Sequence, residues 1–350
     1  MRTVRVGKRL VGEGQPCFLA AEVGINHNGN LELAHRSIDA AADAGADAVK
    51  FQNYRTEDFV SDRLLTHEYL SQGKKVVESQ YDMFKRCELA PEKLRELREH
   101  CDRRGVIFFS TPTSESGIEE LVEIGVPLLK NGSDYLVNLP LIRAMARTSL
   151  PTVISGGMAT FTDVKDAVDA FRGAGGRDLI LLHCTSSYPT PPEDVHLRKM
   201  AALSAAFDCA VGLSDHTVGN VAAIGAVALG ACMIEKHFTL DRNLPGPDHW
   251  FSADPAEFRA LAEAVRSVEK SLGSAELKPA ASEQLGRRDY RLSCVAAREL
   301  PAGHRLLTSD IAFRRPGSGF PPKEVENLLA RELVRSIPPG HVFADEDFAE

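Results

Sequence analysis

The sequence contains no apolar run close to the ~18 residues needed to span a membrane. Residues 1–16 hold several positive charges but lack the continuous apolar stretch of a signal peptide. An excess of positive charge is missing as well, because 41 Lys and Arg stand against 49 Asp and Glu and give a net charge of −8. This balance disfavours a general nucleic-acid-binding surface. We therefore expect a cytoplasmic protein with no membrane partner and no nucleic-acid partner.

Two kinds of motif are also absent. The seven cysteines include no C-x-x-C pair, their number is odd, and most lie in apolar runs, which favours reduced thiols in a cytosol over a disulfide framework. Neither a P-loop nor a G-x-G-x-x-G sequence is present, so a bound phosphate or carboxylate has to be held by side chains. An anionic substrate then requires a locally basic pocket.

The chain does contain a regular alternation of short apolar runs and amphipathic stretches between residues 17 and 271. Each run predicts a strand, and each stretch predicts the helix that follows it. Eight such units match the usual size of a (β/α)8 TIM barrel, whereas a doubly wound open sheet, the alternative, is disfavoured by the missing dinucleotide fingerprint. The predicted strands are 18–21, 48–51, 106–109, 127–129, 152–154, 179–182, 210–213 and 233–235.

Three segments depart from this alternation. Residues 54–89 form a long polar insertion after the second strand, and residues 273–290 mix Ala, Glu, Lys and Pro without an apolar period. Residues 291–350 carry short β-like runs separated by Pro and Gly turns. We therefore predict an α/β chain with a barrel domain over residues 1–272, a linker over 273–290 and a small β-rich domain over 291–350.

Polar side chains follow all eight predicted strands. Solvated turns are the ordinary explanation for such residues, but they would not place an ionisable or hydroxyl group after every strand. Because barrel active sites lie at the C-terminal ends of the strands, we expect these side chains to surround one catalytic site. They are Glu22, Lys50, Gln52, Ser110, Thr111, Lys130, Ser133, Ser155, His183, Ser214, His216, Lys236 and His237.

Two of these residues, His216 and His237, come directly after consecutive strands. Parallel strands of a right-handed βαβ unit end at the same edge of the sheet, so the two imidazoles can bind one divalent metal ion there. Packed core histidines are the alternative. No third firm protein ligand is evident, which favours an open site for Mn²⁺, Mg²⁺, Fe²⁺ or Zn²⁺ over a closed structural zinc site.

The lysines form a second candidate set with the hydroxyl residues. Two lysines at a barrel mouth can be Schiff-base nucleophiles or solvent-facing charges, but four hydroxyls from separate strands favour a cradle for a small phosphate or carboxylate. This cradle comprises Lys50, Lys130, Thr111, Ser133, Ser155 and Ser214. Beside it, Glu22 is a candidate general base or proton relay, with a structural ion pair as its alternative. Asp248 lies on a Pro/Gly-rich loop after the eighth strand and is placed to reach a substrate hydroxyl.

The ordered motifs resemble those of the sialic acid synthases, which comprise N-acetylneuraminate synthase and its legionaminic and pseudaminic acid relatives. The resemblance covers nearly the whole chain. Its barrel motifs are AEVGINHNG (21–29), DAVKFQ (47–52), FFSTP (108–112), LHCTSSYPTPPEDV (182–195), GLSDHT (212–217), EKHFTL (235–240) and PDH (247–249). The tail around RRPGSG (314–319) is similar to the family's antifreeze-like (SAF) domain.

The resemblance implies a phosphoenolpyruvate-dependent transferase. Such enzymes condense phosphoenolpyruvate with an N-acylhexosamine, such as N-acetylmannosamine or a 6-deoxy-diacetamido relative, and with water. They release a nine-carbon 2-keto-3-deoxy acid and phosphate by C–O cleavage. A divalent metal, most commonly Mn²⁺ with Mg²⁺ or Co²⁺ as alternatives, would lie on His216 and His237. A homodimer with swapped C-terminal domains is implied as well.

The resemblance also implies roles for single residues. Glu22 and Asp248 would be catalytic, and Arg315 of the other subunit's small domain would reach the sugar. Phosphoenolpyruvate would be bound by Lys50, Thr111, Lys130, Ser133, Ser155, Ser186 and Ser214. The sugar would contact Gln52, Tyr188, Asp248 and Arg315.

The chain departs from the family pattern at Thr113, Tyr135 and Gly156. These departures lie on the side of the site that would bind the sugar. They leave the identity of the acceptor sugar open but do not change the expected class of reaction. Another phosphoenolpyruvate-dependent keto-deoxy sugar acid synthase with a different aldose acceptor is the alternative.

Overall fold

The computed structural model describes residues 3–349. It divides after Gly273 into two compact units, which are described separately below. The outermost residues of the two predicted domains, 1–2 and 350, lie outside the described residues. Within the described part of the chain, no helix has both the length and the apolarity needed to cross a membrane.

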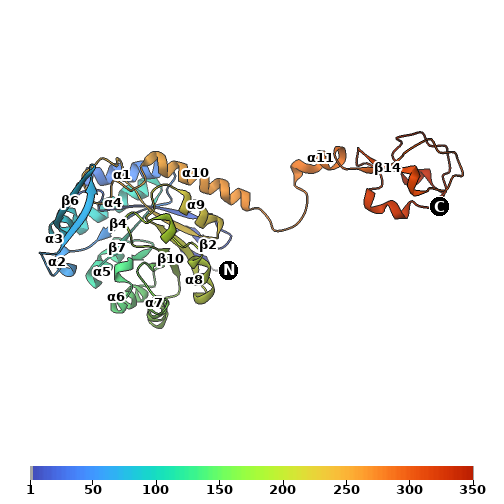
Figure 1. Cartoon of the computed structure of the whole chain (residues 1–350). Coiled ribbons are helices and arrows are strands. Elements are labelled where there is room, and N and C mark those ends of the chain that lie inside the picture. The colour runs from blue at the N-terminus through green and yellow to red at the C-terminus, as the bar shows by residue number, and fades with distance from the viewer. Residues whose placement is uncertain (1–2, 350) are drawn as a thin grey trace. The chain divides into compact units, whose positions relative to one another are not determined.

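The first unit contains a closed barrel of eight strands (Figure 1). Every strand pairs in parallel with the strands on either side, and the circle closes between β9 and β10. The predicted TIM barrel is therefore confirmed. Its strands are β3 (Phe18–Gly24), β4 (Ala48–Asn53), β7 (Ile107–Pro112), β8 (Leu129–Asn131), β9 (Thr152–Ser155), β10 (Leu179–Cys184), β11 (Ala210–Asp215) and β12 (Met233–His237).

A ring of helices covers the outside of the barrel, with apolar faces packed on the strands (Figure 1). Local sequence sets their ends: Asn30 accepts a hydrogen bond from Leu33 N at the start of α1, and Gly105 ends α4 at a φ of 71°. The ring comprises α1 (Leu31–Asp43), α4 (Pro91–Arg104), α5 (Glu115–Glu123), α6 (Leu139–Arg147), α7 (Phe161–Gly173), α8 (Lys199–Phe207), α9 (Val221–Ala228) and α10 (Pro255–Leu272).

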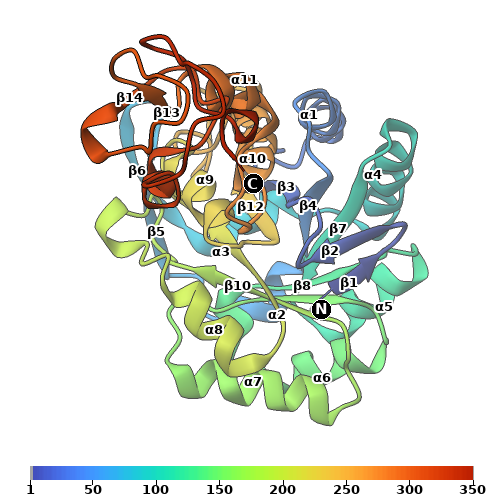
Figure 2. The ribbon, with the colours of Figure 1, turned by 90° about the vertical axis from the view of Figure 1, so that its right-hand side faces the viewer.

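A hairpin that the sequence analysis did not predict precedes the barrel. Its strands, β1 (Thr3–Val6) and β2 (Arg9–Gly12), are antiparallel. Val4, Val6 and Val11 are buried and join a cluster with residues at the beginnings of the barrel strands. The hairpin therefore closes the N-terminal end of the barrel (Figure 2), and the opposite end carries the site.

The polar insertion after β4 is folded rather than irregular. It contains α2 (Thr56–Phe59), a hairpin of β5 (Thr66–Ser71) and β6 (Lys74–Ser79), and α3 (Gln80–Cys87). Gln72 and Gly73 form the hairpin turn with φ values of 52° and 72°, the left-handed geometry that tight two-residue turns require. The prediction of the fourth strand was also wrong by two residues, since 127–129 was expected and Leu129–Asn131 is observed.

The second unit has its own small core, with short irregular segments around a two-stranded sheet. Two buried aspartates organise it in the same way. Asp310 binds the Arg298 guanidinium and the His304 imidazole, and Asp347 binds Arg335 and His341. The elements of the unit are η3 (Ala281–Glu283), α11 (Gln284–Asp289), β13 (Ser293–Ala296), η4 (Thr308–Asp310), β14 (Ile311–Arg314), η5 (Pro322–Asn327) and η6 (Asp345–Asp347).

Candidate active site

A cavity of about 460 Å³ opens at the C-terminal ends of the barrel strands, and each of the eight strands contributes a side chain to its wall. Because side chains alternate along a strand, residues two apart point into it together, such as Glu235 with His237. The cavity is also bordered by the insertion after β4 and by the loop after β12. The predicted site residues that line it are Glu22, Lys50, Gln52, Thr111, Lys130, Ser133, Ser155, Ser186, Tyr188, Ser214, His216, His237 and Asp248.

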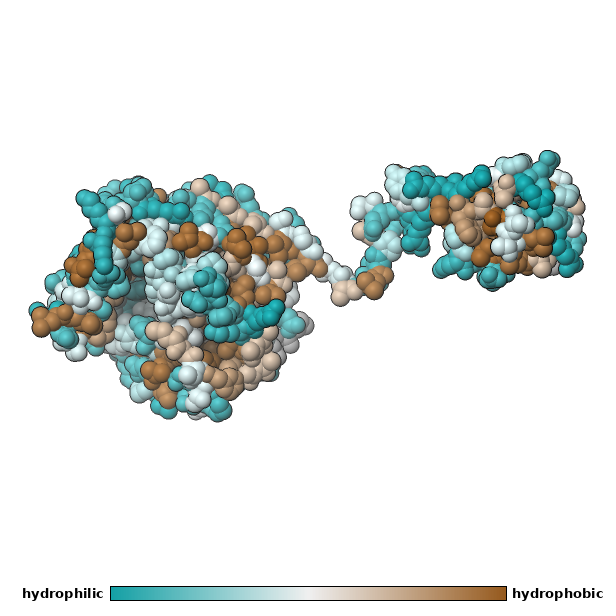
Figure 3. All heavy atoms as spheres, viewed as in Figure 1, coloured by the Kyte–Doolittle hydropathy of each residue, from teal (hydrophilic) through white to brown (hydrophobic). Residues whose placement is uncertain are grey.

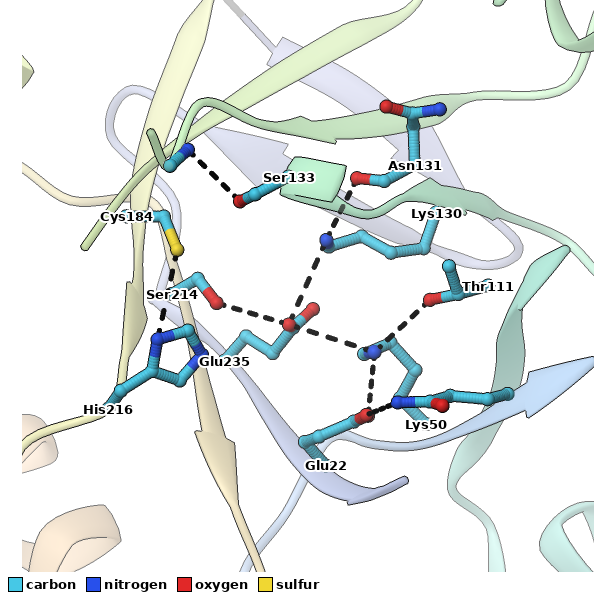
Figure 4. A network of polar contacts seen from close by, with 12 residues as sticks. Glu22, Lys50, Thr111, Lys130, Asn131, Ser133, Cys184, Ser214, His216 and Glu235 are labelled. Atoms are coloured by element: carbon cyan, nitrogen blue, oxygen red, sulfur yellow. Dashed lines mark hydrogen bonds and ion pairs between the residues drawn. The ribbon is translucent and has the colours of Figure 1, made fainter. Parts of the chain in front are cut away.

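Two lysines and two carboxylates form a buried network at the floor of the cavity (Figure 4). Lys50 Nζ lies 2.7 Å from Glu22 Oε2 and 3.7 Å from Glu235 Oε1, and it donates to Thr111 Oγ1 at 3.2 Å. Lys130 Nζ lies 3.8 Å from the same oxygen of Glu235. Glu235 thus lies between two ammonium groups, and each ammonium group has three donors, so both can also donate to the oxygens of a small multiply charged anion.

Glu235 was not among the predicted site residues, although its motif was. The signal available was the alternation along β12, which puts Glu235 and His237 on the cavity side and Lys236 on the other. Lys236 is buried away from the cavity, where its Nζ binds Asp215 Oδ2 at 2.8 Å. Ser110 and His183 do not line this cavity either, so these three residues at strand ends lie outside the site.

The two carboxylates differ in protonation because their surroundings differ. Burial raises the pKa of Glu22 to about 7, since the attraction of Lys50 only partly offsets the lost solvation. Burial also acts on Glu235, but Lys130 and Lys50 outweigh it and hold the pKa of Glu235 below its ordinary value. Burial lowers the pKa of Lys130 despite the opposing charge of Glu235. Of these two carboxyl groups, Glu22 is thus the one that can exchange a proton near neutral pH.

The hydroxyl groups approach one another at one side of the cavity because Gly157 has no side chain. A Cβ atom at Gly157 would stand 2.3 Å from Ser186 Oγ and 2.7 Å from Ser133 Oγ. Ser133 Oγ accepts a hydrogen bond from Gly157 N at 3.0 Å, and Ser155 Oγ is buried without a partner. This cluster can donate to the oxygens of a bound anion.

The two imidazoles lie edge to face, with ring centroids 5.2 Å apart and an angle of 64° between their planes. His216 Nδ1 lies 2.8 Å from Thr185 O; because a carbonyl only accepts, Nδ1 carries the hydrogen and Nε2 of the neutral ring keeps a lone pair. His237 Nδ1 is buried without a hydrogen-bond partner, and Asp248 Oδ2 lies 3.8 Å away. Both rings can therefore act as ligands.

Protonation of the two rings is shifted in opposite directions. Burial, followed by the charge of His216, holds the pKa of His237 well below its usual range. Burial also opposes a charge on His216, but Cys184, with Sγ 3.8 Å from Nδ1, outweighs it and raises the pKa of His216. No set of three His, Cys, Asp or Glu side chains within residues 3–349 is placed to hold a metal. The residues fit an open site completed by water or substrate oxygens.

The loop that carries Asp248 is held by contacts with the loop after β3 and with β5. Asn28 Nδ2 donates to Pro245 O at 2.8 Å, and Gly246 N donates to Ser71 Oγ at 3.1 Å. Burial raises the pKa of Asp248 to about 6, against the opposing charge of His216. Arg315, the remaining predicted residue, belongs to the second unit, where its guanidinium lies 5.2 Å from the centre of the Tyr290 ring.

A closed α/β barrel with paired lysines, carboxylates and imidazoles at its strand ends defines a barrel enzyme acting on an anionic substrate. The chain belongs to the NeuB family, whose model matches residues 37–277, and a SAF domain follows at residues 293–349.

Two curated relatives match along almost the whole chain. The chain is 42% identical over 333 residues to the uncharacterized protein MJ1065 of Methanocaldococcus jannaschii, covering 95% of both. It is 39% identical over 333 residues to N,N′-diacetyllegionaminic acid synthase of Legionella pneumophila, covering 94% of both. The crystal structure of N-acetylneuraminic acid synthetase from Leptospira borgpetersenii superposes with a TM-score of 0.74 at 35% identity, covering 81% of this chain and 95% of that one.

Proposed function

We propose that this chain is a phosphoenolpyruvate-dependent transferase of the N-acetylneuraminate synthase type. It condenses phosphoenolpyruvate with an N-acylhexosamine and water, giving a nine-carbon 2-keto-3-deoxy acid and phosphate. The single observation that carries the proposal is the convergence of two buried lysines, Glu22, two imidazoles and four serines on one cavity. The named relatives that match along the chain support the same reaction.

The floor of the cavity fits phosphoenolpyruvate. Lys50 and Lys130 would neutralise its carboxylate and phosphate charges, and Thr111 with the serine hydroxyls would donate to the remaining oxygens. Carbon 3 of phosphoenolpyruvate then attacks the aldehyde carbon, and water adds at carbon 2. The tetrahedral product then breaks its C–O bond to phosphate, while its new hydroxyl group becomes the 2-keto oxygen and gives its proton to the leaving phosphate. In this sequence the water loses a proton and the aldehyde oxygen gains one.

Glu22 and Asp248 are the groups placed to move these protons. Both are buried beside the cavity and have raised pKa values, about 7 and about 6, so each can accept or release a proton near neutral pH. His216 and His237 would hold a divalent ion, most commonly Mn²⁺ with Mg²⁺ or Co²⁺ as alternatives. When bound, such an ion polarises the aldehyde carbonyl as a Lewis acid.

The complete site needs a second chain in this proposal. Arg315 would reach the sugar from the small domain of the partner in a homodimer with swapped C-terminal domains, residues 291–350 closing over a barrel built from residues 1–272. A guanidinium fork beside Tyr290 is suited to polar groups of a sugar. A cytoplasmic location agrees with seven buried cysteines.

Isotope labelling tests the reaction class directly. The chain is incubated with Mn²⁺, an N-acylhexosamine and phosphoenolpyruvate that carries ¹⁸O at the bridging oxygen. C–O cleavage sends the label to inorganic phosphate and yields a keto-deoxy acid that is one three-carbon unit longer than the sugar. Label retained in the organic product, or no phosphate release with any N-acylhexosamine, would exclude the proposal.

A further inference from the structure

A second cavity, of about 500 Å³, lies in the barrel unit beside the active-site cavity. This side cavity is bordered by β9, β10, α7 and α8. Figure 3 shows apolar residues on the surface of the barrel unit near α7 and α8, which Figure 1 labels. Its size and its largely apolar walls are typical of sites that bind small organic molecules. The apolar side chains that line it include Leu136, Ile154, Val164, Leu181, Ala202 and Leu203.

Three basic side chains line the side cavity as well, namely His183, His196 and Lys199. They lie close together: burial lowers the pKa of His183, and the charges of Lys199 and His196 lower it further. Within residues 3–349, Lys199 forms no ion pair, and Asp194 is the one carboxylate among the described residues that line this cavity. The surplus of basic groups favours a ligand with a negative charge.

An exposed aromatic ring borders the same cavity. Phe161 lines it at 63% exposure. Its ring stacks on the ring of Phe207, with centroids 5.4 Å apart and 24° between the planes. This contact holds the Phe161 ring in place while much of it stays accessible, so the ring can pack against an aromatic group of a ligand.

Two residues at the side cavity have strained backbone conformations. Met158 has a φ of 60° and His196 a φ of 48°, in the left-handed region that bulky side chains rarely adopt. Both line the side cavity. Residues of this kind persist only where their surroundings hold them, and they are concentrated at ligand clamps and switch segments. The strain is an observation independent of the charge, and it favours a ligand site at the same place.

The side cavity and the active-site cavity share part of their walls. The segment 156–158 separates them: Gly156 lines the side cavity, and Gly157 N donates to Ser133 Oγ of the anion cradle at 3.0 Å. A Cβ atom at Gly157 would stand 2.3 Å from Ser186 Oγ, so the segment cannot move further toward the serine hydroxyls without displacing them. The residues that line both cavities are Met158, Cys184 and Ser186.

From these observations we propose that the side cavity binds a small organic anion with an aromatic body, and that this occupant weakens the binding of phosphoenolpyruvate in the anion cradle. The apolar walls and Phe161 would hold the aromatic body, and Lys199 with the two histidines would hold the negative group. The occupant would press on Met158 and displace Gly157 toward the serine hydroxyls. Binding in the side cavity does not depend on the proposed function, whereas the effect on phosphoenolpyruvate does.

A fluorescent dye of this chemistry tests the site. Anilinonaphthalene sulfonate (ANS) joins an aromatic body to one negative group, and N-phenylnaphthylamine has the same rings without the charge. Titration of the full chain should show one saturable ANS site. The neutral dye should bind it about tenfold or more weakly, because it lacks the charge-assisted contact.

Matched variants on α8 locate the dye. Ala202 lines the side cavity and its neighbour Ala201 does not, although both are exposed. Ala202→Trp should therefore abolish the ANS site, and Ala201→Trp should keep it. Lys199→Met should raise the Kd for ANS about tenfold or more, whereas Arg198→Met, next to it but not lining the cavity, should change the Kd by less than about twofold. Circular dichroism verifies that the variants fold, and the Lys199 pair decides if Ala202→Trp does not.

Titration of phosphoenolpyruvate against bound ANS tests the coupling. No sugar is added, so no reaction takes place. Because coupling between two sites is reciprocal, phosphoenolpyruvate should raise the Kd for ANS about fivefold or more, up to a plateau that is reached when the anion cradle is full. A Kd that keeps rising in proportion to phosphoenolpyruvate would show that the dye competes for the cradle itself, which would overturn the proposal.

The remaining outcomes separate this proposal from the proposed function. Equal ANS binding by Ala202→Trp and Ala201→Trp, or by Lys199→Met and Arg198→Met, would place the dye elsewhere and overturn the site. A Kd for ANS that phosphoenolpyruvate leaves unchanged, in a protein that releases phosphate from it with a sugar, would overturn the coupling. Failure to release phosphate with any N-acylhexosamine would instead contradict the proposed function, and the dye variants would still decide whether the side cavity binds an anion.

Discussion

Lys50 Nζ and Glu22 Oε2 lie 2.7 Å apart in an ion pair that is almost completely buried. Loss of solvation by itself would neutralise one member or both. The charge and the hydrogen bond of Lys50 act against this loss at Glu22, and the charge of Lys130 adds to them. Glu235 favours the charged form of Lys50 but opposes that of Glu22. The floor of the cavity is thus balanced in charge before an anion binds, and Glu22 is the group most easily protonated.

The pH dependence of kcat/KM should follow the ionisation of Glu22. Its pKa of about 7 lies above the ordinary value of a glutamate. If Glu22 acts as a base, its active ionised form is therefore lost as the pH falls below about 7. We expect kcat/KM to fall about tenfold for each pH unit on the acid side. Glu22→Gln should remove this limb and lower kcat at least about a hundredfold, whereas Glu22→Asp should keep the limb. A Glu22→Gln variant with the original profile and rate would assign the carboxylate a structural role.

The lysines should act by charge and not by covalent chemistry. Lys50→Met and Lys130→Met each remove a charge-assisted contact worth ~1.5–3 kcal/mol, so the KM for phosphoenolpyruvate should rise about 10- to 150-fold. Borohydride should trap no adduct with either substrate. Lys236→Met is the control: it breaks a buried pair with Asp215 outside the cavity, so it should lower stability but not phosphoenolpyruvate affinity. A trapped Schiff base at Lys50 or Lys130 would place the chain among lyase-type aldolases.

The two imidazoles should be required together with a divalent ion. His216→Ala and His237→Ala should each lower kcat about a thousandfold, as expected when ~4 kcal/mol of transition-state stabilisation is lost. Calorimetric binding of Mn²⁺ to the resting protein should weaken in parallel. His183→Asn offers a comparison, because His183 is buried near the strand ends but does not line this cavity. Near-normal turnover of both alanine variants after chelation would exclude a metal at this position.

Gly157 should permit anion binding because it has no side chain to displace the neighbouring serine hydroxyls. Its absent Cβ would stand 2.3 Å from Ser186 Oγ, so Gly157→Ala has to displace the serine hydroxyls. We expect KM for phosphoenolpyruvate to rise at least about tenfold, because several charge-assisted contacts weaken together. Gly173, at the end of α7, has open space where a Cβ would lie. The Gly173→Ala variant should therefore bind phosphoenolpyruvate with an unchanged KM. Equal KM values in the two variants would show that the serines do not contact the anion.

The barrel could be predicted from the sequence, and so could many of the side chains that line its cavity, because strand ends and hydrophobic periodicity are local signals. Lys50 and Gln52 are two residues apart on one strand, so a single strand assignment orients both of them. Glu235 was missed, and Lys236 was wrongly included, because the same alternation was not applied to β12. His237 was predicted to face the site, so Glu235, two residues before it, lies on the same side of the strand and Lys236 on the other. The β1–β2 hairpin did have a signal, because Val4, Arg5 and Val6 alternate as in a half-buried strand and Gly7 follows them. Residues 1–16 were examined only for the apolar stretch of a signal peptide.

Two other features were not predicted. One depends on contacts between segments that are distant in the sequence, and the other is an internal repeat. The part of the cavity wall that the insertion after β4 contributes forms only when this segment folds over the strand ends. The polar composition of the insertion gave no sign of this. The two aspartate clusters of the second unit did have a signal. Arg298, His304 and Asp310 recur with the same spacing, 37 residues later, as Arg335, His341 and Asp347. An internal comparison of the sequence would have revealed this repeat.

The last prediction concerns Arg315 and whether the small domain acts at the barrel of its own chain or at that of a partner, as proposed. Arg315→Ala should raise the KM for the sugar and leave that for phosphoenolpyruvate nearly unchanged, since Arg315 lies outside the barrel unit that holds the anion cradle. Mixing Arg315→Ala subunits with His216→Ala subunits then distinguishes cis from trans. If the domain acts in trans, each mixed dimer has one site with both defects and one site with neither. Random exchange should restore about a quarter of the normal activity. Mass spectrometry shows whether the subunits have exchanged. If they have and activity does not recover, the swapped arrangement is refuted and Arg315 is assigned to its own barrel.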